Sequence, residues 1–102
     1  MRRGTTPTYV LDLSKIPAER VIDICLAFTQ TKSGHSLFLH MDEGRVTVNG
    51  NLGYAALTQE ETNAFAKGKV KRQVKVKYED NVVRSTDIET EDVYDVLHEE
   101  VL

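Results

Sequence analysis

The sequence contains one cysteine, Cys25, two prolines and no tryptophan. A single cysteine excludes an internal disulfide and a metal site built from several cysteines of one chain. The lack of tryptophan, with aromatic residues at 7% of the chain, argues against a platform on which sugars or nucleic-acid bases stack. The net charge of -3 argues against a general attraction of the whole molecule to nucleic acid.

Long apolar runs are also missing. Nowhere do about 18 apolar residues follow one another, so we expect no membrane span. The opening MRRGTTPT carries two arginines without an apolar run behind them, and we therefore expect no secretory signal peptide. The 102 residues, 40% of them hydrophobic, suit one domain over residues 1–102 with one modest core.

Period-two alternation of apolar and polar residues predicts a fold made of short strands. In Val21 to Gln30, one face carries Ile22, Ile24, Leu26 and Phe28. We expect further strands at Pro7 to Leu13, Ser36 to Met41, Arg45 to Val48, Tyr54 to Leu57, Lys69 to Tyr78 and Val82 to Glu91. These roughly seven strands predict an all-β, immunoglobulin-like antiparallel β-sandwich with one short helical turn. A small β-barrel is the alternative.

Two neighbouring strands in the first half are expected to form a hairpin. The Asp42–Gly44 turn would join Ser36–Met41 to Arg45–Val48, with Val46 and Val48 facing inward. The turn formers of Asn49 to Gly53 then predict a surface loop.

The stretch from Leu57 to Tyr78 begins as a helical turn. Thr58 is placed to cap it, and Glu60 and Glu61 lie near the positive end of its first turn. Phe65 can pack inward, and Gly68 is placed to end the turn with a positive φ.

The same stretch continues as the longest strand, which has one apolar and one basic face. Arg72 interrupts the apolar face, where we expect it to lie at the rim or to pair with an acid such as Asp92. A tight turn centred on Asp80 would place Lys71 opposite Glu89 and Lys69 opposite Glu91. Such pairs would neutralise the lysines, so a nucleic-acid-binding strip over Lys67–Lys77 is the weaker interpretation.

No pattern in the sequence predicts catalysis. The histidines His35, His40 and His98 lack the spacing of metal ligands, and no base is evident beside Cys25. The adjacent acids Glu60 and Glu61 do not face each other on a helix. We therefore expect no enzyme activity, no metal or other cofactor and no small-molecule substrate.

The two ends of the chain are expected to differ from the domain body. Residues Met1 to Thr6 read as a polar, mobile arm. The tail from Asp92 to Leu102 could form a capped helix or an extended segment leading away from the domain. Its apolar residues are candidates for a partner contact: Val96, Leu97, Val101 and Leu102.

Three stretches resemble small uncharacterised proteins encoded by phages and prophages of Gram-positive bacteria. The opening MRRGTTPTYVLDL resembles their start, and VYDVLHEEVL resembles their close. The middle, VTVNG followed by LTQEETNAFAKGKVKRQVKVKY, is similar to their pattern of strand, helical turn and long strand. That middle pattern is shared more loosely with N-terminal β domains of phage tail-fibre and baseplate proteins, such as the baseplate upper protein.

The resemblance covers about half of the chain, and the sequence departs from it at Thr31–Met41 and at Asn81, where a glycine is often seen. It implies a virion or tail-associated structural protein with an immunoglobulin-like sandwich, located in the virion or the host cytoplasm. It supplies no active residue that could be carried over.

Three functions remain as hypotheses. The first is a structural or assembly module of a phage particle, whose partner is itself or another virion protein. The second is a carbohydrate- or host-surface-binding module using Tyr54 and Tyr94. The third is nucleic-acid binding through Lys67–Lys77, Arg2 and Arg3, which predicts retention on heparin that falls steeply with salt.

Overall fold

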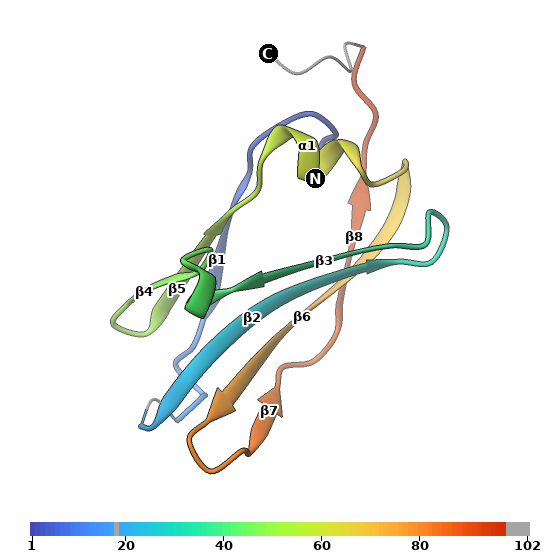
Figure 1. Ribbon diagram of the computed structural model, residues 1–102. Coiled ribbons are helices and arrows are strands. Elements are labelled where there is room, and N and C mark those ends of the chain that lie inside the picture. The colour runs from blue at the N-terminus through green and yellow to red at the C-terminus, as the bar shows by residue number, and fades with distance from the viewer. Residues whose placement is uncertain (18, 98–102) are drawn as a thin grey trace.

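The computed structural model describes residues 1–17 and 19–97. Figure 1 shows a mostly β protein with two antiparallel sheets and one short α-helix. One sheet has the strand order β1-β5-β4, and the other has the order β3-β2-β6-β7, with β8 also paired to β6. In chain order the elements are β1 (Thr8–Asp12), β2 (Val21–Gln30), β3 (His35–His40), the 3-10 turn η1 (Met41–Glu43), β4 (Thr47–Asn49), β5 (Leu52–Ala56), α1 (Gln59–Asn63), β6 (Gly68–Tyr78), β7 (Val83–Ser85) and β8 (Glu89–Val93).

The inner faces of both sheets share one hydrophobic core. Leu11 of β1 and Ala55 of β5 come from the three-stranded sheet, and Leu26 and Val76 come from the five-stranded sheet. All four are buried because alternate residues of a strand point to the same face. The strands divide into two sheets, so the predicted all-β class is confirmed and the described strands do not close into a small barrel.

One expected core position of β2 lies outside the core. The pairing of β2 with β6 shifts register between Val21 and Asp23. This irregularity changes the alternation at the start of the strand, and Ile22 is exposed although Ile24 is buried.

The helical turn forms where the sequence places it. The Thr58 hydroxyl accepts a hydrogen bond from the Glu61 N–H, and the Glu61 carboxylate accepts one from the Thr58 N–H. This capping box pairs two N–H groups that the helix itself leaves free. Phe65 follows the helix and is fully buried, as expected. Gly68 has the predicted positive φ of 131°, but it begins β6 rather than ending α1.

The expected hairpin between Ser36–Met41 and Arg45–Val48 is wrong. β3 pairs with β2, while β4 pairs with β5, so η1 carries the chain from one sheet to the other. β4 and β5 are joined through Gly50, whose positive φ of 62° allows a tight turn. Val46 is buried as expected, whereas Val48 is exposed.

The predicted pairs Lys71–Glu89 and Lys69–Glu91 are wrong by one residue. These residues do lie on adjacent strands, but β8 is offset along β6. The structure gives the pairs Lys71–Thr90, Lys69–Asp92, Val70–Glu91 and Arg72–Glu89.

The offset arises at Thr86, between β7 and β8. Its N–H donates to the Val74 carbonyl at 2.9 Å, and its hydroxyl accepts from the Val74 N–H at 3.0 Å. The Thr86 side-chain oxygen thus takes the place of a backbone carbonyl opposite Val74. The segment from β7 to β8 therefore holds one more residue than the part of β6 that it faces. A slip of one residue moves each following side chain to the other face, which is why Glu89 and Glu91 share the face of Arg72.

The segment expected to be a mobile arm is bonded to the end of β8. Arg2 and Tyr94 form a parallel bridge, and the Arg3 N–H donates to the Tyr94 carbonyl at 3.0 Å. The Arg3 side chain donates to the Phe65 carbonyl at 2.7 Å. Figure 1 accordingly shows the N-terminus beside α1 and the end of β8.

The tail is extended as far as the structure describes it. Asp92 and Val93 complete β8, and no helix forms between them and Leu97. These residues are therefore extended, as one alternative expected, but through Asp95 they are bonded to the domain and do not lead away from it. Among the helices of the described ranges, none could span a bilayer.

Candidate functional site

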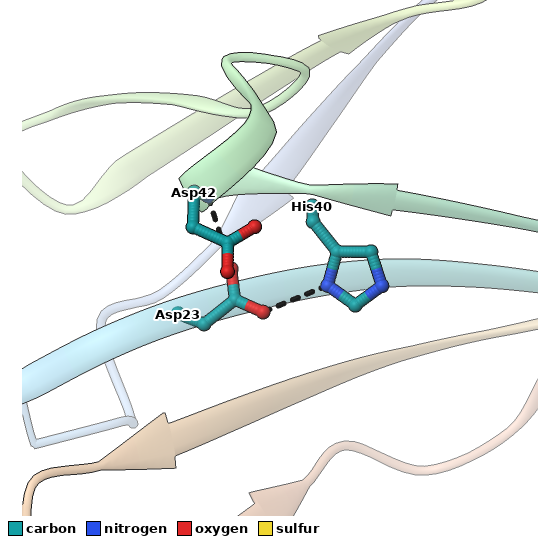
Figure 2. Close-up of side chains that lie close together, drawn as sticks. All are labelled: Asp23, His40 and Asp42. Carbon is teal, nitrogen blue, oxygen red and sulfur yellow. Dashed lines mark hydrogen bonds and ion pairs between the residues drawn. The ribbon is translucent and has the colours of Figure 1, made fainter.

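A polar cluster on the outer face of the five-stranded sheet is the strongest candidate for a chemical site. Asp23 of β2, His40 of β3 and Asp42 of η1 bring their ligand-type atoms within 4.8 Å of one another. Figure 2 shows the Asp23 carboxylate between the His40 ring and Asp42. The register Cys25–His40 creates this arrangement, because it places His40 diagonally across from Asp23.

Hydrogen bonds within the structure account for the cluster. His40 Nδ1 donates to Asp23 Oδ2 at 2.7 Å, and the Asp42 N–H donates to Asp23 Oδ1 at 3.2 Å. Each Asp23 oxygen thus has a partner, and the carboxylate ties β3 and η1 to β2. A cation bound by Asp23, His40 and Asp42 would have to displace the Nδ1–Oδ2 hydrogen bond, so the arrangement favours an ion pair.

The two partners perturb each other's pKa in opposite directions. The hydrogen bond to Asp23 raises the pKa of His40, and partial burial opposes this only in part. Burial of Asp23 raises the pKa of its carboxyl, but the hydrogen bonds from His40 and from the Asp42 N–H outweigh it and lower the pKa. Both shifts stabilise the charged pair.

Replacing Asp23 with asparagine is expected to cost stability only in a limited pH range. The raised His40 pKa contributes stability below its unfolded value of about 6.5 and loses it as pH rises through the folded value. The lowered Asp23 pKa contributes stability above about 3.9. The partly exposed pair should therefore contribute less than about 1 kcal/mol, with the contribution present at pH 5.5 and reduced at pH 8.5. Urea denaturation of wild type and D23N at both pH values measures it.

Asp12→Asn is the matched control for this prediction. Asp12 accepts a hydrogen bond from the Ser14 N–H and has no histidine partner. The effect of D12N should therefore be equal at pH 5.5 and pH 8.5. A D23N cost that grows from pH 5.5 to pH 8.5 would contradict the assigned ion pair.

Cys25 has a base beside it, contrary to the sequence-based expectation. Its Sγ lies 3.7 Å from His40 Nε2, while Nδ1 of the same ring is held by Asp23. This order of thiol, imidazole and carboxylate is that of an activated nucleophile. However, the thiol is buried, and burial raises its pKa, so it stays protonated and weakly reactive at neutral pH. The other described histidine, His35, packs edge-on against Phe65, and His98 lies outside the described residues.

Arg72 lies at the rim of the inner face and is paired with acids, in line with both expectations, but Asp92 is not its partner. Its guanidinium contacts Glu89 at 2.8 Å and Glu91 at 3.6 Å. The Tyr9 hydroxyl donates to Glu91 at 2.6 Å. Burial, followed by this hydrogen bond, raises the pKa of Tyr9. These charges explain why a basic residue interrupts an apolar strand face.

The lysines of β6 lie on the outer face and are less neutralised than expected. Lys69 contacts Asp92 at 2.6 Å, and this exposed pair raises the lysine pKa through its hydrogen bond. Within residues 1–17 and 19–97, no ion pair involves Lys71, Lys75 or Lys77. Phe38 of β3 is exposed on the same face. This surface therefore combines lysines that make no ion pair within the described residues with an exposed aromatic side chain.

The candidate partner residues of the tail are only partly within the described chain. Val96 is half-buried and Leu97 is fully exposed. Val101 and Leu102 lie outside the described residues. Of the two tyrosines considered for carbohydrate binding, Tyr54 is half-buried and Tyr94 carries the Arg2 guanidinium over its ring.

The Asp23–His40 pair was missed by the sequence analysis, although a signal for it exists. The turn formers Lys32 to Gly34 predict that β2 and β3 pair, which brings the polar positions of both outer faces together. Comparison of the chain with models of known protein families, with curated proteins and with solved structures finds no match.

Proposed function

We propose that this chain is a non-enzymatic structural or assembly component of a phage or prophage particle, associated with its tail or baseplate, and that it self-associates. Its location would be the virion or the host cytoplasm. We also propose that the two sheets form an immunoglobulin-like sandwich, with eight strands rather than about seven.

The observation that carries the self-association proposal is the exposed end of the tail. Leu97 has a relative exposure of 109%, and it follows a segment that is firmly bonded to the domain through Val93, Tyr94 and Asp95. An isolated exposed leucine is common, but here it begins a segment whose sequence adds Val101 and Leu102. Burial of these side chains on a neighbouring copy would remove apolar surface from water. The similarity of the chain's opening, middle and close to phage proteins supports the particle context.

The proposal is tested by comparing the full chain with a chain that ends at Asp95. Cutting there keeps the buried Val93 and the Arg3–Asp95 ion pair of 3.1 Å. We expect the mass of the full chain in solution to rise with concentration, while the shortened chain stays monomeric. Sedimentation over a 100-fold concentration range measures both masses. Equal melting temperatures serve as the control, and a monomeric full chain at every concentration would refute self-association.

Nucleic-acid binding stays a second candidate because of the basic outer face. Lys71, Lys75 and Lys77 lie on one strand face with exposed Phe38 nearby across the sheet, and the pairing expected for Lys71 does not form. Against this, Arg2 and Arg3 are engaged with Tyr94 and Asp95. Within the described residues, only four lysines of the expected strip make no ion pair, Lys67, Lys71, Lys75 and Lys77, which favours the first function.

A further inference from the structure

An apolar pocket opens at the end of the molecule away from α1. Its volume is about 210 Å³, and its lining is mostly aliphatic: Leu13, Ile16, Val21, Ile24, Met41 and Val48. These residues come from the connection after β1, the start of β2, η1 and β4. Figure 1 shows these segments at the opposite end from the tail that follows β8.

The size of the pocket suits a side chain better than a free ligand. Pockets for small organic ligands have volumes of about 300–1,000 Å³ and usually contain a few directed polar groups. A cavity of about 150 Å³ lined by aliphatic residues accepts one benzene-sized group. The present pocket therefore has room for one or two aliphatic side chains.

The tail of the same copy does not reach this pocket. The molecule is 45 Å long, with the pocket and Leu97 toward opposite ends, and five residues after Leu97 span at most about 17 Å when fully extended. The apolar side chains as far as Leu102 therefore cannot fill the pocket of their own copy, whereas those of a second copy can.

We propose that copies of this chain associate head to tail, with Leu97 and the residues after it entering the pocket of the next copy. This inference rests on the proposed self-association and specifies its geometry. The pocket and the tail are at opposite ends, so each copy offers one of each. Such a heterologous contact builds a ring if its rotation closes and a filament if it does not.

Charges near the pocket are mixed. The groove that shares Pro17 with the pocket contains Arg20 and Arg84 together with Glu19 and Asp80. The acidic residues Asp42 and Glu43 follow the lining residue Met41, and the tail is acidic at Asp95 and, by sequence, at positions 99 and 100. Burial of apolar surface is therefore what drives the proposed contact.

The test uses two full-length variants that each damage one side of the contact. Leu97→Asp damages the tail, and Val48→Arg places a charged side chain at the pocket. Both positions are exposed, so the fold should be kept. Loss of one buried leucine should weaken association about 10- to 100-fold. Matched controls are Ile88→Asp and Val10→Arg, exposed positions outside the tail and the pocket, which should leave association unchanged.

An equimolar mixture of L97D and V48R decides the geometry. Each variant alone should be monomeric, whereas the mixture should form a dimer that grows no further. In that dimer the intact tail of V48R enters the intact pocket of L97D. A wild-type oligomer that neither variant weakens would refute the head-to-tail contact. Loss of association in both variants, without recovery in the mixture, would also refute it. In both cases self-association itself would still stand. A monomeric wild type would refute both proposals.

Discussion

Phe28→Ala is expected to lower the free energy of unfolding by about 3–5 kcal/mol, measured by urea denaturation. Phe28 is fully buried in the second half of β2. Its ring contacts Tyr9 edge-on, with centroids 5.2 Å apart, and lies 6.0 Å from the ring of Phe65. Alanine would leave a cavity between the two sheets that rigid strands cannot refill. A loss of this size is a large part of the total stability of a small domain, about 5–15 kcal/mol.

The neighbouring strand provides a matched control. Phe38 of β3 has the same side chain but points outward and is 57% exposed. Phe38→Ala should change stability by no more than about 0.5 kcal/mol. Similar losses in F28A and F38A would contradict the assignment of inner and outer faces.

Gln30→Leu is expected to cost about 2–4 kcal/mol, although it makes a buried site more apolar. The Gln30 side chain is almost fully buried, and its amide nitrogen donates to the carbonyls of Ala66 and Lys69 at 2.7 and 3.3 Å. Its oxygen accepts from the Ala66 N–H at 2.8 Å and from the Ser33 hydroxyl at 2.6 Å. Leucine would leave these backbone groups without partners, at roughly 1–3 kcal/mol for each buried group.

Gln73→Leu is the comparison for this effect. Gln73 is half-buried on the outer face, and its amide makes one hydrogen bond, to the Thr86 carbonyl at 2.7 Å. We expect a cost of no more than about 1 kcal/mol, because water can reach the carbonyl that is left. Urea midpoints and m-values of both variants separate a loss of stability from a change in the unfolded state. A Q30L variant as stable as wild type would show that the buried amide is dispensable.

Local features of this fold could be predicted from the sequence. The capping box at Thr58 and Glu61 depends on two residues three positions apart. The alternation that buries Ile24, Leu26 and Phe28 is likewise read from neighbours in the chain. The predictions for these positions are confirmed because the forces that decide them act within a few residues.

Long-range pairing could not be predicted in the same way. The offset of β8 depends on one Thr86 hydroxyl that replaces a backbone carbonyl opposite Val74. The pairing of β3 with β2, and of β4 with β5, depends on how η1 directs the chain from one sheet to the other. The hydrophobic pattern did not distinguish these outcomes from regular hairpins, so Val48 was expected to face inward and Glu89 to lie opposite Lys71.

The candidate sites also differ in whether they depend on local or long-range structure. The apolar residues of the tail can be read directly from the sequence, whereas the Asp23–His40 pair requires the register of two strands. The pocket near Met41 is lined by residues from separate segments that include β2, η1, β4 and β6, so no single stretch of sequence predicts it.

The bridge between Arg2 and Tyr94 sets both ends of the described domain at one pole. A fluorophore or affinity label attached beside Arg2 or Tyr94 would therefore lie at that pole, at the other end of the molecule from the pocket near Met41.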